Sequence, residues 1–161
     1  MKKNWLWYIL AVVLIICDQS SKWLAIHTLP LYQPMTVFPG LNWTLMFNSG
    51  SAFGFLNQSS VWWYSYLFTA FGLLMSVGLI IWMSLCKKKE KIELLALSFI
   101  LSGALGNVID RIQFGYVIDF IQVYYGEHYF PVFNIADSAI CVGAVLLFFA
   151  NHKKTPRKKV K

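Results

Sequence analysis

The sequence predicts an all-α membrane protein, with four transmembrane helices, a small extracytoplasmic β-element and a surface loop or helix. Composition is the first reason, since 58% of the 161 residues are hydrophobic and 13% are charged, against about 25% charged residues in typical soluble domains. So much apolar surface excludes a disordered chain, and a domain of this length has too small an interior to hide it from water. We therefore expect one integral membrane domain over residues 1–161.

Four apolar segments are the second reason, because each is long enough to span about 30 Å of hydrocarbon as a helix. Two of the connecting loops are long and contain neither Lys nor Arg, whereas the short loop 87–91 contains four Lys. Loops rich in Lys and Arg stay in the cytoplasm, so the short loop and both termini are expected there and the long loops outside. The predicted helices are residues 5–26, 61–86, 92–112 and 134–150, the outer loops are 27–60 and 113–133, and the basic tail is 151–161.

The first outer loop carries the predicted β-element. Between residues 32 and 48, mixed apolar and polar positions flank the turn Phe38-Pro39-Gly40, which is typical of two short strands joined by a tight turn. Both outer loops are rich in aromatic residues, which favour the headgroup layer of a membrane. We expect both loops to lie on the membrane surface.

Charge and cysteine placement exclude other classes. The net charge is +7, but most basic residues lie in the short loop and at the chain ends, which indicates cytoplasmic anchors near anionic lipid rather than a nucleic-acid surface. The first segment has the pattern of a signal peptide, yet Ile16 stands where cleavage before Cys17 requires a small residue, so we expect a retained helix. Cys17, Cys86 and Cys141 form no CxxC or Cys/His cluster and are interpreted as apolar helix residues, with no metal site.

Ionisable residues in or beside the apolar segments are the candidates for function, because each costs about 2.5–3.5 kcal/mol at the centre of a membrane. In the predicted topology they all lie toward the outer side, although they come from three distant stretches of the chain. Asp18 and Lys22 are four residues apart on one helical face and can form an ion pair. Arg111 can hold a carboxylate or a lipid headgroup, with Asp110 ordering the loop; a structural role is the alternative for both pairs. The six residues are Asp18, Lys22, Asp110, Arg111, Asp119 and Asp137.

Asp119 and Asp137 differ from the others because neither has a basic residue within five positions and both lie among apolar residues. If they meet in space they would share a proton, since two carboxylates in a low dielectric do not both ionise cheaply. Such a pair can activate a water molecule and donate to a carbonyl, as in aspartic proteases. The spacing leaves three interpretations open: a catalytic dyad, an intramembrane proton or ion relay, and capping of helix ends.

Neutral polar residues are expected at the same depth. They are Asn48, Asn107 and Asn134, of which the last precedes a predicted helix and fits an N-cap. Gly103 and Gly106 are three residues apart on a predicted helix, and small residues there allow another helix or a peptide to approach closely.

Five motifs in order along the chain resemble those of the bacterial lipoprotein signal peptidases, the signal peptidase II family. Each motif alone is weakly specific, but the five together, with four predicted spans, are highly specific. Ser21 stands where the family often has Thr, and it keeps the hydroxyl. The motifs are Asp18-Gln19-Ser20-Ser21-Lys22, Asn48-Ser49-Gly50-Ser51-Ala52-Phe53-Gly54, Gly103-Ala104-Leu105-Gly106-Asn107-Val108-Ile109-Asp110-Arg111, Val117-Ile118-Asp119-Phe120 and Phe133-Asn134-Ile135-Ala136-Asp137.

The resemblance implies a multi-pass aspartic endopeptidase of the bacterial cytoplasmic (inner) membrane, with its active site at the outer leaflet face. Such enzymes remove signal peptides from prolipoproteins, cutting just before a Cys that already carries diacylglycerol; they need no metal or other cofactor and are inhibited by globomycin. A monomer in contact with membrane lipid suffices, and no nucleic acid is implied. By motif, the catalytic pair would be Asp119 and Asp137, the substrate-binding residues Asn48, Gly103, Asn107, Arg111 and Asn134, and the supporting residues Asp18, Lys22 and Asp110.

A small membrane transporter or proton relay that uses the acidic cluster is the alternative function. It would need polar residues through the whole membrane thickness, whereas the predicted cytoplasmic halves, such as 6–16 and 142–150, are almost purely apolar. A non-enzymatic membrane scaffold would not need buried Asp, and a thiol oxidase would need paired outward cysteines.

Overall fold

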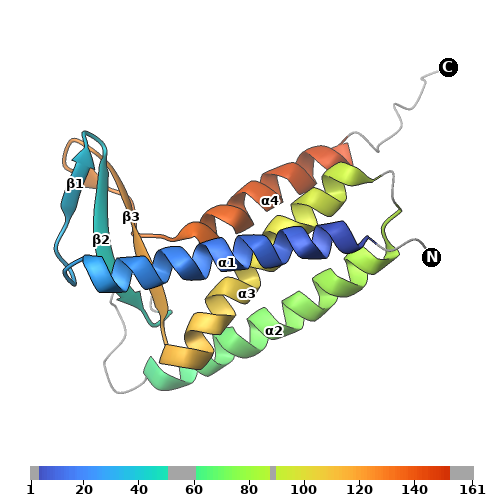
Figure 1. Ribbon diagram of the computed structural model, residues 1–161, viewed down its shortest axis with the longest axis horizontal. Helices are drawn as coiled ribbons and strands as arrows, with labels where there is room; N and C mark the ends of the chain where they lie inside the picture. Colours follow the sequence, from blue (N-terminus) through green and yellow to red (C-terminus); the bar gives the residue numbers. More distant parts are fainter. Residues whose placement is uncertain (1–3, 51–60, 88–89, 153–161) are drawn as a thin grey trace.

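The computed structural model of the chain describes residues 4–50, 61–87 and 90–152. The end of the motif that begins at Asn48 and most of the predicted basic tail lie outside these ranges. Within them, four helices form a bundle, and four strands form a sheet at one end of that bundle (Figure 1).

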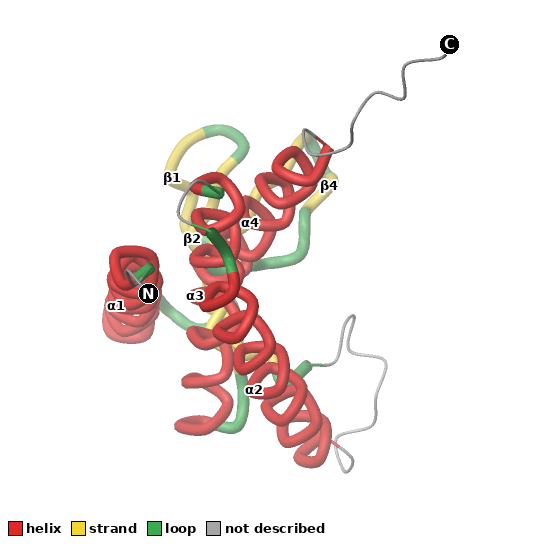
Figure 2. The backbone as a smooth tube through the Cα atoms, turned by 90° about the vertical axis from the view of Figure 1, so that its right-hand side faces the viewer, coloured by secondary structure: helices red, strands yellow, loops and turns green. Residues whose placement is uncertain are grey.

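The four helices are α1 (Trp5–Thr28), α2 (Val61–Leu85), α3 (Lys91–Phe114) and α4 (Ile135–His152), and each bound lies within two residues of the predicted one. α3 lies in the middle of the bundle and contacts the other three helices (Figure 2). The starts of α1 and α3 and the ends of α2 and α4 gather at the end remote from the sheet (Figure 1). This arrangement fits the predicted alternation of the helices across a membrane.

The outer faces of the helices are apolar, the reverse of a soluble bundle. Trp23 on α1 and Phe71 and Leu74 on α2 are all more than half exposed, which fits contact with lipid tails. Within the described ranges, three helices are long and apolar enough to cross a membrane, and the apolar part of α4, residues 135–150, is shorter. The chain is therefore a multi-pass membrane protein.

Two glycines let α3 and α4 pack closely. A Cβ on Gly143 would lie 2.7 Å from the carbonyl oxygen of Ala96, and a Cβ on Gly103 would overlap the carbonyl oxygen of Ala136. Small residues commonly serve this purpose between membrane helices. The helix-packing interpretation therefore accounts for Gly103 in this structure.

The strands β1 (Met35–Phe38), β2 (Leu41–Asn48), β3 (Val117–Tyr125) and β4 (His128–Tyr129) pair in that order, each antiparallel to the next. The strand pair predicted in the first outer loop is confirmed. Gly40 lies in its turn with φ at +98°, a left-handed conformation that glycine adopts without strain.

The second outer loop differs from the surface loop or helix expected beside the β-element, because it supplies β3 and β4 to the same sheet. Its sequence is rich in β-branched and aromatic residues, which fit a strand. β3 pairs with β2 so that Asp119 lies opposite Met46. A local pattern could not predict this pairing, since the two strands are far apart in the chain.

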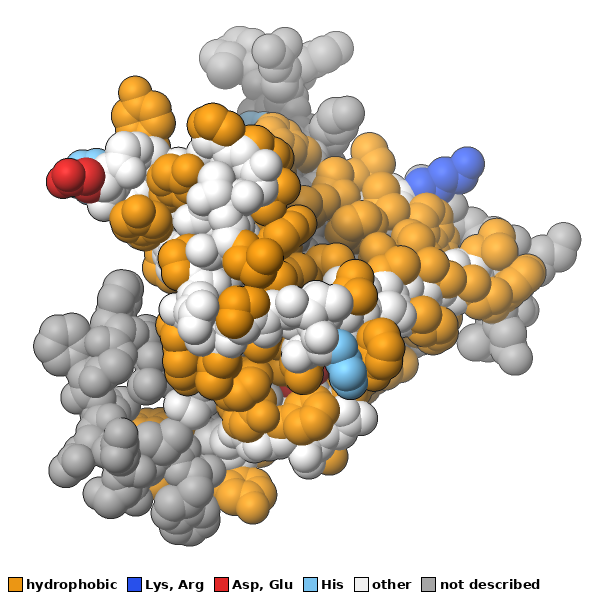
Figure 3. Space-filling model, turned by 60° about the vertical axis from the view of Figure 1, so that its left-hand side comes forward, with side chains coloured by type: hydrophobic (Ala, Val, Ile, Leu, Met, Phe, Trp, Pro, Cys, Tyr) orange, Lys and Arg blue, Asp and Glu red, His pale blue; other side chains and the backbone are white. Residues whose placement is uncertain are grey.

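The sheet packs against the end of α1 through an apolar cluster. Ala25, Leu45, Ile118 and Phe120 form its buried centre, so β2 and β3 are fixed against the helix next to the polar residues described below. Figure 3 shows this end of the molecule, where hydrophobic side chains cover most of the face and charged groups are few. Such a face fits the predicted position in the headgroup layer, which stays a prediction.

Candidate active site

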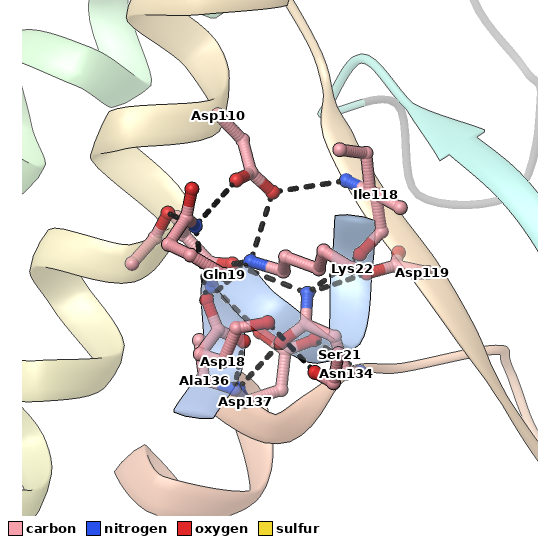
Figure 4. A network of polar contacts seen from close by, with 12 residues as sticks. Asp18, Gln19, Ser21, Lys22, Asp110, Ile118, Asp119, Asn134, Ala136 and Asp137 are labelled. Atoms are coloured by element: carbon pink, nitrogen blue, oxygen red, sulfur yellow. Dashed lines mark hydrogen bonds and ion pairs between the residues drawn. The ribbon is translucent and has the colours of Figure 1, made fainter. Parts of the chain in front are cut away.

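A buried polar layer lies where α1, α3 and α4 meet β3 (Figure 4). Such groups are rarely buried unless they have partners, and here each has at least one. The side chains that are nine-tenths or more buried there are Asp18, Lys22, Asn107, Asp110, Asp119 and Asn134. All six are candidates from the sequence, and the structure brings them together from distant segments of the chain.

Asp137 lies in the first turn of α4, as predicted, because Asn134 caps that helix. The backbone N–H of Asp137 donates to Asn134 Oδ1 at 2.8 Å, and the backbone N–H of Asn134 donates to Asp137 Oδ2 at 3.2 Å. This reciprocal pair is a capping box with Asn and Asp in its two positions. It fixes the carboxylate of Asp137 at the end of the helix rather than leaving it to rotate.

The same Asn134 side chain also holds Asp119. Its Nδ2 donates to Asp119 Oδ1 at 2.7 Å, so one amide contacts both aspartates. A second amide adds a parallel link: Asn107 Nδ2 donates to Asp137 Oδ1 at 2.8 Å, while Asn107 Oδ1 accepts from Asn134 Nδ2 at 3.2 Å. The structure therefore brings the two aspartates of the predicted dyad into one hydrogen-bonded group.

Asp119 is the aspartate with the strongly altered acidity. Its pKa is raised from 3.8 to about 7, chiefly by burial and also by the nearby Asp137 carboxylate, against the hydrogen bonds from Asn48 and Asn134 and the charge of Lys22. Asn48 stands at the exposed end of β2 and donates from Nδ2 to Asp119 Oδ2 at 3.0 Å. A carboxyl group with this pKa gains and loses a proton near neutral pH.

An ion triad lies behind the two aspartates. Lys22 Nζ is 2.9 Å from Asp18 Oδ2, which confirms the predicted pair, and 2.8 Å from Asp110 Oδ2. The second partner was not predicted for Lys22. Gln19 was also not singled out from the sequence, although its Nε2 donates to Asp110 Oδ1 at 2.8 Å. A polar Gln beside Asp18 in an otherwise apolar helix was the feature that could have indicated its role.

Arg111 lies beside the layer, at an apolar pocket of about 220 Å³ between α2, α3 and α4. Its guanidinium carbon is 5.4 Å from the centre of the Phe68 ring, and its Nη1 donates to the backbone oxygen of Asn107 at 3.4 Å. Within the described residues, no carboxylate forms an ion pair with Arg111, and its buried Nε has no hydrogen-bond partner. Asn107 and Arg111 both line the pocket, whereas Gly103 does not.

Groups that could ligate a metal come together elsewhere, at the other end of the bundle. One ligand atom each of Cys86, Glu90 and Glu93 lies within 4.8 Å of the others. Two of these side chains already accept hydrogen bonds from protein groups, since Trp82 Nε1 donates to Glu93 and the backbone N–H of Lys87 donates to Glu90. The three cysteines are free thiols.

Fold and site together define a multi-pass membrane protein with a carboxylate-rich polar layer at one end of its bundle. The family model described as "Signal peptidase (SPase) II" matches residues 10–152. The chain belongs to this family of membrane proteases, so the family predicted from the five motifs is confirmed.

Relatives and solved structures agree over nearly the whole chain. The "Lipoprotein signal peptidase" of Acinetobacter baylyi is 45% identical over 162 residues, covering 98% of this chain and 90% of the relative. The protein of the same name from Polynucleobacter necessarius is 47% identical over 146 residues, covering 91% and 88%. A solved structure described as "Bacterial membrane enzyme structure by the in meso method at 2.3 A resolution" has a TM-score of 0.82 and 32% identity, covering 98% of this chain and 94% of that chain.

Proposed function

We propose that this signal peptidase is an aspartic endopeptidase that removes signal peptides from diacylglyceryl-modified prolipoproteins, cutting just before the lipidated Cys. One observation carries the proposal: the side chain of Asn134 is bonded to both Asp119 and Asp137. The Asp119 carboxyl accepts from Asn134 Nδ2. The Asp137 carboxyl accepts from Asn107 Nδ2 and from the backbone N–H of Asn134. Two carboxyl groups in one buried hydrogen-bonded group of this kind can share one proton. Ser/His or Cys/His nucleophile pairs would need a different set of side chains in this layer.

In the proposed reaction, a proton rests on Asp119 while Asp137 is ionised. Asp137 takes a proton from a water molecule as the water oxygen attacks the scissile carbonyl carbon, and Asp119 donates its proton to the carbonyl oxygen. Asp137 then gives its proton to the amide nitrogen, the C–N bond breaks, and Asp119 recovers a proton from a hydroxyl of the tetrahedral intermediate. One water is consumed, and no covalent enzyme intermediate forms.

Substrate contacts are proposed for the groups beside the dyad. The signal peptide must unwind near the cut, which frees backbone carbonyls that water does not reach in a membrane. Arg111 is placed to bind one of them because its Nε is buried without a partner in the described part of the chain. Asn48 and Asn107 are placed to contact substrate at the dyad, whereas we assign Gly103 and Asn134 to holding α4 and the aspartates.

We infer the membrane arrangement from the charge pattern. α4 is the fourth span, both termini face the cytoplasm of a bacterial cell, and the polar layer lies at the outer leaflet of the inner membrane. The scissile bond of a lipoprotein precursor lies at that depth, with its lipid chains beside the protein. We propose further that a monomer suffices, that the enzyme needs no metal, and that globomycin inhibits it.

Cleavage of a diacylglyceryl-modified prolipoprotein by the purified protein in detergent tests the proposal. Asp119→Asn and Asp137→Asn should each abolish cleavage while the protein stays folded, and Glu127→Gln, which alters an exposed carboxylate on the β3–β4 turn, should cleave normally. Near-normal turnover by either Asp variant would remove that residue from the dyad. A covalent acyl-enzyme trapped with substrate would refute the water mechanism, and proton flux through liposomes without cleavage would favour a relay.

A further inference from the structure

Each of the two aspartates directly follows a residue whose backbone N–H donates to a carboxylate from a different helix or strand. Ala136, before Asp137, donates its N–H to Asp18 Oδ1 at 2.9 Å. Ile118, before Asp119, donates its N–H to Asp110 Oδ2 at 3.1 Å. Consecutive Cα atoms are held 3.80 Å apart, so each bond fixes the main chain one residue before an aspartate.

Lys22 joins these two carboxylates. Its Nζ lies 2.9 Å from Asp18 and 2.8 Å from Asp110, and all three residues are at most 1% exposed. Gln19 makes a second bridge, since its Nε2 lies 3.2 Å from Asp18 Oδ2 and 2.8 Å from Asp110 Oδ1. A continuous set of short contacts therefore connects the start of α4 to β3 through α1 and α3 (Figure 4).

Stability alone does not explain this triad. A buried ion pair is often no more stable than apolar residues of the same volume, and here one ammonium faces two carboxylates beside an acidic site. The presence of two carboxylates is explained if the backbone N–H groups of Ala136 and Ile118 must be held at a fixed distance from each other, because each carboxylate binds one of them. Lys22 also donates to Asn107 Oδ1 at 3.2 Å, which turns the amide of Asn107 so that its Nδ2 faces Asp137.

We propose that Lys22 is a positioning residue which, with Asp18 and Asp110, clamps Ala136 to Ile118 and so sets the spacing of the two aspartates. The proposal rests on the dyad function given above. Lys22 touches neither the substrate nor the reacting atoms. It acts through the two backbone N–H groups and through Asn107, so its loss mainly changes the geometry of the dyad and has a smaller effect, through Asn107, on the affinity for substrate.

Three variants of the full-length protein in detergent test the clamp. Lys22→Met removes the ammonium and leaves two carboxylates uncompensated. Lys22→Met with Asp18→Asn restores the net charge of the triad and keeps an oxygen acceptor for Ala136, but does not restore the bridge. Ser98→Ala is the matched control, because Ser98 Oγ links α3 to the backbone oxygen of Trp7 on α1 at 3.0 Å, outside the polar layer.

The kinetic readout separates positioning from stability. A misplacement of about 1 Å costs on the order of 100-fold in rate, so we expect kcat to fall about 10- to 100-fold in both Lys22 variants and KM to change much less than kcat. The double variant should regain stability against SDS unfolding but not kcat, and Ser98→Ala should keep kcat. Recovery of kcat together with stability in the double variant would overturn the clamp and leave Lys22 a stabilising residue.

Amide hydrogen exchange gives a readout that does not need cleavage. The N–H groups of Ile118 and Ala136 should exchange faster in both Lys22 variants than in the wild type or Ser98→Ala. Unchanged protection at these two positions would refute the clamp. Absence of cleavage by the wild type would instead count against the proposed function, and the exchange rates would still decide whether the clamp exists.

Discussion

Asp119 couples the stability of this protein to pH in a direction that can be worked out from its surroundings. It is 2% exposed, and its pKa is raised from 3.8 to about 7, chiefly by burial. Between these two values the folded protein keeps the proton on Asp119 while the unfolded chain has lost it. The free energy of unfolding therefore falls as pH rises through this window and levels off above about pH 7.

Replacing Asp119 by Asn removes this titration. One pKa unit corresponds to 1.36 kcal/mol, so the full cost of ionising Asp119 in the folded state is about 4 kcal/mol. The substitution has a separate cost at every pH, because both oxygens of Asp119 accept from amide groups, those of Asn48 and Asn134. An Asn at this position turns an NH₂ group toward one of these donors, which costs about 1 kcal/mol.

The two effects predict that the stability curves cross. Asp119→Asn should be less stable than the wild type by about 1 kcal/mol at pH 3 and more stable by about 3 kcal/mol at pH 8. The measurement is SDS-induced unfolding of the purified protein in mixed micelles at one-unit pH steps, with Glu127→Gln as the control for an exposed carboxylate. A difference between variant and wild type that does not change with pH would refute the account of Asp119.

Three further predictions concern turnover. In pH–rate profiles, kcat should fall as pH rises through about 7, because the proton that Asp119 donates is lost, and a kcat that keeps rising to pH 9 would contradict this. Gly103→Ala should cost about 1–3 kcal/mol of stability and also lower kcat, since the new Cβ overlaps the carbonyl of Ala136 beside the dyad. Gly143→Ala is the matched change farther along α4 and should lower stability alone; equal kcat losses in both variants would contradict the distinction. Arg111→Gln should raise KM by about tenfold, as for one lost charge-assisted hydrogen bond, with a smaller effect on kcat, and an unchanged KM would exclude Arg111 from substrate binding.

Local patterns in the sequence predicted the parts of the structure that depend on nearby residues. The helices follow from apolar length, and the first strand pair follows from its turn at Gly40. The Asp18–Lys22 ion pair follows from helical spacing alone. The position of Asp137 in the first turn of α4 follows from Asn134, which is a preferred cap residue.

For residues from distant segments, the sequence predicted only that they lie at a common membrane depth, and it did not predict which of them are in contact. The pairing of β3 with β2 depends on two strands from different loops, so the second outer loop could not be recognised as part of the sheet. The bond from Lys22 to Asp110 depends on how α3 lies against α1. The same contact explains why Gln19 was missed, since its bonding partners are all set by that packing apart from the adjacent Asp18.

The ion pair within α1 also has a consequence for biosynthesis. Lys22 bonds Asn107, which follows it by 85 residues, and a ribosome adds that length of chain in on the order of ten seconds. During this interval the partners of Lys22 on α3 have not yet been synthesised, but Asp18 and Lys22 neutralise each other's charge on one face of α1. α1 can therefore leave the translocon as a nearly neutral helix and remain in the bilayer until the later helices are inserted and pack against it.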